Sequence, residues 1–249
     1  MLMKAALNGS RTPMEHPAIP VTPTQLAQEA RGAVAAGAGA LHVHVRGADG
    51  QESLAPDDVA SALEAIRAAC PGIAVGISTG AWIVPDVSQR LALCNAWEVL
   101  PDFASVNVHE AGSLQMIRLL RDKGVGVEAG IWNAQAADTL VRSGLADACL
   151  RILIEPAEEA GDARANLVRI EAALGQVSRP RLLRGVGAVV WEFVALAAQR
   201  HYDTWTGFED TLTLPDGSRA ENNAALVAAG LRIVAEVVSL PGAGPQAEH

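Results

Sequence analysis

Two histidines separated by a single residue stand at the end of an apolar run and could bind one metal ion together. Residues 40–46 read Ala-Leu-His-Val-His-Val-Arg, an alternation that is typical of a β-strand. It predicts that His42, His44 and Arg46 lie on one face of that strand. Neutral imidazole nitrogens are common zinc ligands. An H-x-H pattern also arises by chance, so the pattern alone leaves an ordinary structural role open.

An acidic pair far along the chain, Glu209 and Asp210, supplies the carboxylates that could complete such a site. Two histidines and one carboxylate leave a fourth position open, as in catalytic rather than structural zinc sites. Arg46 could bind a substrate carboxylate beside them. The alternatives are that Glu209 is a plain loop acid near a helix start and that Asp210 only caps a helix.

A regular alternation of short apolar runs with longer helical patterns predicts the α/β fold that must position these residues. The predicted strands cover residues 4–8, 40–45, 74–78, 102–108, 125–131, 148–155, 181–185 and 202–208. Eight β-then-α units in 249 residues favour a closed (β/α)8 TIM barrel over an open sheet. No G-x-G-x-x-G follows the first strand, which argues against a dinucleotide-binding fold. We expect one domain over residues 1–240 and a disordered tail over 241–249.

In such a barrel the reactive groups gather at the carboxyl ends of the strands. The last strand closes beside the first, so Glu209 can reach an ion held by His42 and His44. Further polar candidates at these ends are Asn8, Ser78, Thr79, Asn107, His109, Glu128 and Glu155. His109 could be a third imidazole ligand or a base, whereas Glu128 could equally be a buried acid paired with an arginine. Gly185 and Gly187 could admit a phosphate at a helix start.

The composition narrows the class of partner and the compartment. A net charge of −9 argues against nucleic acid or an anionic membrane surface as a partner. The three cysteines have no C-x-x-C or pairing pattern, which indicates buried thiols in a reducing compartment. We find no signal peptide and no apolar run long enough to span a membrane. We therefore expect a cytoplasmic protein, and a homo-oligomer because barrels of this kind commonly assemble.

Five stretches of the sequence resemble the β-keto acid cleavage enzymes, a family that includes 3-keto-5-aminohexanoate cleavage enzyme. The first is HPAIPVTPTQLAQEARGAVAAGAGALHVHVRGADG and the last is TGFEDTLTLPDGSRAENNAALVAAG, with GISTGA, SVNV and VEAGIW between them. The resemblance implies a (β/α)8 barrel that binds Zn²⁺ through His42, His44 and Glu209. It also implies that a β-keto acid reacts with acetyl-CoA to give acetoacetate and a new CoA thioester.

The resemblance further implies roles for polar residues around the metal. Asp210 follows the zinc glutamate and would take part in removing the α-proton, Ser78 matches a substrate-contacting serine, and Asn107 and Glu128 match pocket positions. Combining both arguments, we predict catalytic roles for Asp210, Glu128 and Arg46, and substrate contacts for Asn8, Arg11, Ser78, Thr79, Asn107 and Trp205.

Two positions depart from the family pattern. The family usually has an arginine four residues before the zinc glutamate, where this chain has Trp205, and an acid soon after the first strand, where it has Ser10-Arg11. Arg11 or Arg46 could hold the substrate carboxylate instead. Otherwise the changes indicate another reaction, such as aldolase- or decarboxylase-type enolate chemistry without CoA, or a barrel that binds a metal and a ligand without turnover.

Overall fold

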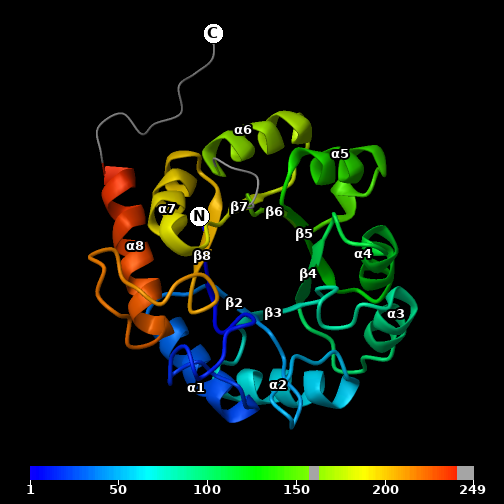
Figure 1. Cartoon of the computed structure of the whole chain (residues 1–249), viewed down its shortest axis with the longest axis horizontal. Coiled ribbons are helices and arrows are strands. Elements are labelled where there is room, and N and C mark those ends of the chain that lie inside the picture. The colour runs from blue at the N-terminus through cyan, green and yellow to red at the C-terminus, as the bar shows by residue number, and fades with distance from the viewer. Residues whose placement is uncertain (157–162, 240–249) are drawn as a thin grey trace.

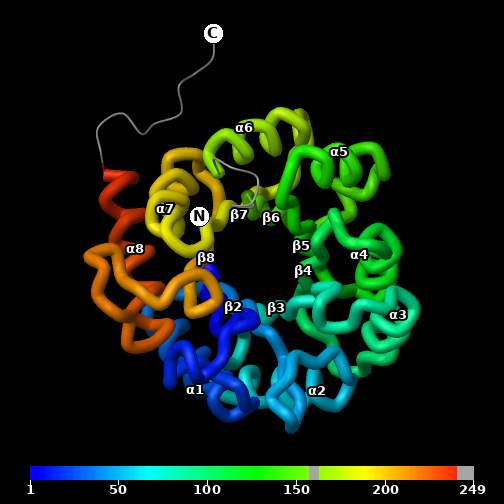
Figure 2. The backbone as a smooth tube through the Cα atoms, viewed as in Figure 1, coloured from blue at the N-terminus to red at the C-terminus, as the bar shows by residue number. Residues whose placement is uncertain are grey.

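Eight parallel strands, β1 to β8 in chain order, form a closed barrel in the computed structural model, which describes residues 1–156 and 163–239 (Figure 1). Each strand pairs with the next along the chain, and β8 pairs with β1 to close the ring. The helices surround the strands (Figure 2). The predicted (β/α)8 barrel is confirmed, whereas the tail predicted at residues 241–249 lies outside the described residues.

The strands are short and agree with the predicted runs to within a few residues. They are β1 Met3–Ala6, β2 Ala40–Val43, β3 Ala74–Ser78, β4 Phe103–Asn107, β5 Gly126–Ile131, β6 Arg151–Ile154, β7 Arg181–Leu183 and β8 Asp203–Thr206. The α-helices are α1 Pro23–Ala35, α2 Pro56–Ala69, α3 Val87–Asn95, α4 Ser113–Asp122, α5 Ala134–Arg142, α6 Ala163–Leu174, α7 Val190–Gln199 and α8 Asn223–Ser239. None of these helices is long and apolar enough to cross a membrane.

Local sequence explains where helices begin and end. The side chain of Thr22 caps α1 by accepting a hydrogen bond from the backbone N–H of Gln25. The side chain of Gln25 in turn accepts one from the backbone N–H of Thr22, and Pro23 stands in the first turn. Asp86 caps α3 in the same way, through the backbone N–H of Gln89. These caps fix the direction in which the chain leaves the barrel rim.

Two clusters of buried apolar side chains include residues of the strands. The larger core lies between the strands and the surrounding helices, where small alanines and branched residues are fully buried. A smaller cluster of Ala6, Leu153, Leu182 and Trp205 lies on strands β1, β6, β7 and β8. Trp205 is only 2% exposed and its indole also contacts His42, so this cluster adjoins the candidate site.

Closure of the barrel depends on a glycine directly after β8. A Cβ at Gly207 would lie 2.0 Å from the carbonyl oxygen of Ala6 in β1, which no other residue type could tolerate. Gly9 has a φ of +57° and leaves room for the Glu209 side chain, which a Cβ there would meet at 2.5 Å. Together these glycines let the chain after β8 pass close to the end of β1 and carry Glu209 toward β2.

Candidate metal centre

The two histidines stand at the carboxyl end of β2. His42 is the third residue of the strand, and His44 follows its last residue. Asn8 fixes the backbone there, because its side chain accepts a hydrogen bond from the His44 N–H at 2.9 Å and donates one to the His44 carbonyl at 2.8 Å. Both imidazoles are almost completely buried. Their position relative to each other is therefore set by the strand and by this amide clamp.

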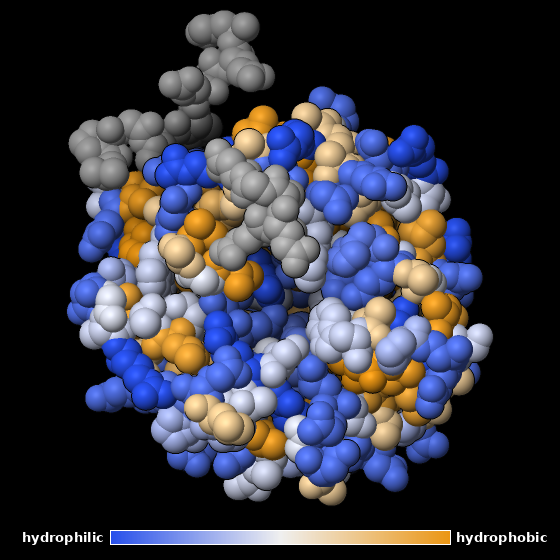
Figure 3. All heavy atoms as spheres, viewed as in Figure 1, coloured by the Kyte–Doolittle hydropathy of each residue, from blue (hydrophilic) through white to orange (hydrophobic). Residues whose placement is uncertain are grey.

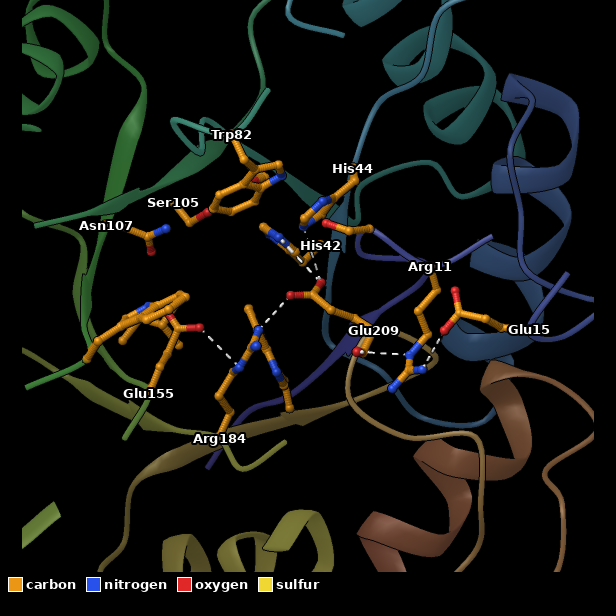
Figure 4. A pocket seen from close by; sticks show the side chains of 15 residues that line it. Arg11, Glu15, His42, His44, Trp82, Ser105, Asn107, Glu155, Arg184 and Glu209 are labelled. Carbon is orange, nitrogen blue, oxygen red and sulfur yellow. Dashed lines mark hydrogen bonds and ion pairs between the residues drawn. The ribbon is translucent and has the colours of Figure 1, made fainter. Parts of the chain in front are cut away.

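Glu209 completes a group that could hold a metal ion (Figure 4). Its Oε2 lies 3.7 Å from Nε2 of His42 and 3.5 Å from Nε2 of His44. Ligands of one tetrahedral zinc, at bond lengths near 2.0–2.1 Å, are about 3.3 Å apart, so the three atoms have nearly the spacing that zinc requires. Oε2 is buried and has no hydrogen-bond partner. The structure thus brings together all three predicted ligands and leaves the atom facing the imidazoles free.

Charges around the group favour the protonation states that a metal needs. Burial lowers the pKa of His42 well below its usual value, which keeps this imidazole neutral. Burial alone would raise the pKa of Glu209, but its positive neighbours lower it: His44 and His42 while a ring is protonated, and the permanently charged Arg184. Neutral imidazole and ionised carboxylate are the metal-binding forms.

His44 is oriented by an acid that the sequence analysis did not identify. Its Nδ1 contacts Oε1 of Glu52, whose other oxygen accepts a hydrogen bond from Nε1 of Trp82 at 3.0 Å. With Nδ1–H donated to a carboxylate, the lone pair of His44 is on Nε2 and directed at Glu209. Glu52 follows β2 in a polar stretch, and no spacing rule marks it as a partner of His44.

Arg184 is the second residue that the sequence did not single out. It follows β7, and its guanidinium donates to Oε1 of Glu209 at 2.6 Å and forms ion pairs with Glu155 at 3.1 Å and Asp210 at 3.5 Å. Its only sequence signal is its position at the carboxyl end of a predicted strand. One guanidinium therefore faces three carboxylates, all of which were among the predicted candidates.

Asp210 is fully buried behind Glu209, and Trp205 holds it. The indole N–H of Trp205 donates to Oδ1 of Asp210 at 3.1 Å, while Oδ2 has no hydrogen-bond partner. Burial raises the pKa of Asp210 to about 8; Arg184 opposes this shift and the charge of Glu209 adds to it. The ring of Trp205 also stacks on His42, with centroids 4.9 Å apart. Trp205, which stands where the family usually has an arginine, thus contacts both the candidate ligand His42 and Asp210.

These groups line a cavity of about 400 Å³ at the carboxyl ends of the strands. Figure 3 shows hydrophilic residues around the hollow at the centre of this face. The lining residues include Ser10, Arg11, Glu15, His42, His44, Ser78, Trp82, Ser105, Asn107, Trp132, Leu153, Glu155, Arg184, Trp205 and Glu209. Four of the predicted substrate contacts, Arg11, Ser78, Asn107 and Trp205, are among them. Ser105, on β4, was not predicted.

Other predicted residues do not line this cavity. The guanidinium of Arg46 donates instead to the carbonyls of Gly9, Arg11 and Gly50, because β2 ends at Val43 and the alternation of faces ends with it. Thr79 bonds the carbonyl of Ser105. The side-chain amide of Asn8 forms hydrogen bonds with the backbone of His44 and donates another to the carbonyl of Pro20.

Glu128, His109 and the two glycines also lie elsewhere. Glu128 is fully buried and pairs with Lys4 and, at 3.3 Å, with Arg151, the first residue of β6. The ring of His109 packs against that of Trp132 at a tilt of 46° and lines a separate cavity beside α4 and α5. The N–H of Gly187 donates to the carbonyl of Asp210 at 3.0 Å, so that glycine positions the aspartate segment, while Gly185 packs closely against Val189 and Phe193.

Comparison with known proteins identifies the family of this chain. The family profile of the beta-keto acid cleavage enzymes matches residues 1–246. The chain belongs to this enzyme family. A 3-keto-5-aminohexanoate cleavage enzyme of Fusobacterium nucleatum subsp. nucleatum is 25% identical over 254 residues, which cover 95% of this chain and 92% of the relative. A 3-oxoadipate:acetyl-CoA acetyltransferase of Cupriavidus necator is 38% identical over 80 residues, which cover 32% of this chain and 28% of the relative.

Solved structures show the same fold at low identity. ObcA in a ternary complex with a C4-CoA adduct and oxalate superposes with a TM-score of 0.67 at 16% identity, covering 89% of this chain. The chain spans 64% of the length of that ObcA chain. A type I 3-dehydroquinate dehydratase of Clostridium difficile gives a TM-score of 0.62 at 12% identity and covers 96% of this chain and 93% of its own. These similarities establish the barrel.

Proposed function

We propose that this protein is a zinc-dependent enzyme that cleaves a β-keto acid with acetyl-CoA. The acyl group of the keto acid would pass to CoA, and the acetyl group would take its place on the two-carbon carboxylate unit, giving acetoacetate and a CoA thioester. The observation that carries the proposal is the convergence of two imidazole Nε2 atoms on the unpartnered, buried Oε2 of Glu209. Family membership supports the reaction class.

The residues present fit a zinc ion. His42, His44 and Glu209 would hold it and leave a fourth position facing the cavity. The ion would supply Lewis acidity for the keto and carboxylate oxygens of the substrate. A cation would also be favoured here because it would help to keep ionised the three carboxyl groups that face the Arg184 guanidinium, those of Glu155, Glu209 and Asp210.

Asp210 is our candidate for the proton acceptor. The indole N–H of Trp205 fixes Oδ1, so the aspartate cannot turn freely, and Oδ2 remains without a partner. A base must be held within reach of the proton it removes, and a fixed carboxylate with one free oxygen meets that need. Burial raises the pKa of Asp210 to about 8, whereas the charge of Arg184 and that of a bound ion would favour its ionised form. We therefore assign Oδ2 of the ionised Asp210 the removal of the proton from the carbon between the two carbonyl groups of the keto acid.

The remaining wall of the cavity would bind and orient the substrate. Ser78, Ser105 and Asn107 come from two adjacent strands and present hydroxyl and amide groups to the cavity. Arg11 lines the opposite wall, where it donates to the carbonyl of Glu209 and pairs with Glu15. A polar wall of this kind suits an oxygen-rich substrate, and Trp132 and Leu153 provide the apolar contact for its side chain.

The first experiment measures the metal content of the purified protein beside that of two variants. His42→Ala removes a proposed ligand, while His109→Ala removes a histidine outside the centre and serves as the matched control. One equivalent of zinc in the wild type and in His109→Ala, lost in His42→Ala, is the expected result. Wild-type protein that takes up no zinc even after reloading contradicts the proposal.

The second experiment separates the reaction from its alternative. A panel of β-keto acids is incubated with the zinc-loaded protein, with and without acetyl-CoA, and products are identified by mass spectrometry. Acetoacetate and a new CoA thioester, formed only with acetyl-CoA, are expected. Turnover at the same rate with and without acetyl-CoA favours aldolase- or decarboxylase-type chemistry. The cytoplasmic location and the homo-oligomer stay predictions from sequence.

A further inference from the structure

Arg184 occupies a position from which it controls one proposed ligand. It follows the last residue of β7, and its side chain is only 11% exposed. Its Nη1 donates to Oε1 of Glu209 at 2.6 Å, the oxygen that does not face the imidazoles (Figure 4). The other oxygen, Oε2, has no hydrogen-bond partner and lies nearest to His42 and His44. The two oxygens of one carboxylate therefore have separate tasks.

The guanidinium itself cannot move freely. Its Nε forms an ion pair with Glu155 at 3.1 Å and lies 3.5 Å from Asp210, and its carbon Cζ lies 4.7 Å from the centre of the Trp205 ring. These contacts come from the residue after β6, from β8 and from the segment after β8, so three parts of the barrel fix one planar group. A guanidinium suits this task because its donors have a fixed geometry.

We propose that Arg184 is a positioning residue that fixes Glu209 as a ligand through a single oxygen. By binding Oε1, it prevents the carboxylate from turning and presents Oε2 to the point on which both imidazoles converge. This inference rests on the proposed zinc site and goes beyond it, since it assigns a task to a residue that acts on the site through Glu209 and is not itself a ligand.

Glu52 is a second residue that orients a proposed ligand without being a ligand itself. Glu52 contacts Nδ1 of His44 and thereby leaves Nε2 free, and Trp82 in turn holds Glu52 at 3.0 Å. Groups outside the ligand set that orient ligands commonly change metal affinity by about 10–100-fold when they are removed. We expect a loss of that size for Arg184, because Glu209 would lose its fixed orientation.

The test measures zinc affinity by competition with a chromophoric chelator for Arg184→Met, Arg184→Lys and Arg151→Met. Arg151 is the matched control: it is 14% exposed and also pairs with two carboxylates, Glu128 and Asp203, but it lies at the amino end of β6. We expect zinc to bind about 10–100-fold more weakly to Arg184→Met. The zinc affinity of Arg184→Lys should lie between those of Arg184→Met and the wild type, because an ammonium keeps the charge but lacks the fixed, planar donor geometry of a guanidinium. Arg151→Met should bind zinc as the wild type does.

Cobalt substitution gives a readout that a general loss of structure would not produce. If Glu209 turns and binds through both oxygens, the coordination number rises and the visible d–d bands of Co²⁺ weaken in Arg184→Met but not in Arg151→Met. Zinc affinity and cobalt bands equal to wild type in both Arg184 variants overturn the inference. Where the methionine variant does not fold, the lysine variant decides, since its affinity must still lie below wild type. Failure of the wild-type protein to bind zinc overturns the proposed function instead.

Discussion

A buried ion pair inside the barrel allows the structural role of Glu128 to be separated from the catalytic role predicted for it. Lys4 and Glu128 are both completely buried and in contact, and the Lys4 ammonium lies 3.9 Å from the centre of the Trp205 ring. Burial lowers the pKa of Lys4 to about 8, although Glu128 opposes the shift, so at pH 7 the ammonium is still charged. Removing one partner leaves the other charge buried.

We predict that Lys4→Met lowers the free energy of unfolding by about 3 kcal/mol, the lower end of the range for breaking a buried pair. The lower end applies because Glu128 keeps Arg151 at 3.3 Å. The double variant Lys4→Met/Glu128→Met removes both charges and replaces them with apolar groups of similar size. Such replacements are often neutral or stabilising, so the double variant should be close to wild type.

The assay is urea-induced unfolding at pH 7, followed by both tryptophan fluorescence and circular dichroism, for the wild type, both single variants and the double variant. A favourable coupling of about 2 kcal/mol or more between the two sites is expected from a buried pair. A loss below about 1 kcal/mol in Lys4→Met, or a double variant worse than the sum of the single variants, refutes the reasoning. If Glu128 is structural, the double variant also keeps the zinc content of the wild type.

Three further outcomes follow from contacts described above. Trp205→Phe keeps an aromatic ring but removes the N–H that donates to Asp210. We expect kcat of the zinc-loaded enzyme to fall about tenfold or more, since a hydrogen bond to a charged group contributes about 1.5–3 kcal/mol. An unchanged zinc content distinguishes this effect from loss of the ion. Gly207→Ala places a Cβ 2.0 Å from a backbone carbonyl of β1, so the variant should yield little folded protein on expression, and a stable barrel would show that this contact can relax. Burial raises the pKa of Cys94 to about 12 and that of Cys149 to about 11, so both thiols should resist iodoacetamide at pH 8 in the native protein and react after unfolding, as counted by mass spectrometry.

The barrel could be predicted because its signals are local. Strands appear as apolar runs, and helix starts follow from capping residues such as Thr22 and Asp86, whose hydrogen bonds lie within one turn. The grouping of the three candidate ligands could also be predicted, because the order of strands in a closed barrel places β8 beside β1 and β2 next to β1. Once the barrel is assumed, the sequence is enough to place His42, His44 and Glu209 close together.

The surroundings of the ligands could not be predicted, since they depend on side chains that meet across distant elements. Arg184 acquires its role from carboxylates that follow β6 and β8, and nothing near it in the sequence indicates those contacts. For Arg46, in contrast, the sequence predicted a position that the structure does not show. The alternation that placed Arg46 beside the histidines holds only while the strand continues, and β2 ends at Val43. Beyond that residue, carbonyl groups of the loops determine where its guanidinium lies.

The passage of the chain at Gly207 joins the two ends of the barrel at the candidate centre. His42 and His44 belong to the second strand, and Glu209 to the segment after the eighth, so the ligand set exists only once the ring has closed. A growing polypeptide cannot assemble it until its last strand has been synthesised. An ion held there would bind the native state and not its open forms, and would stabilise the closed ring in proportion to the logarithm of its free concentration. In a cell short of zinc, such a protein would lose resistance to proteolysis together with its chemistry.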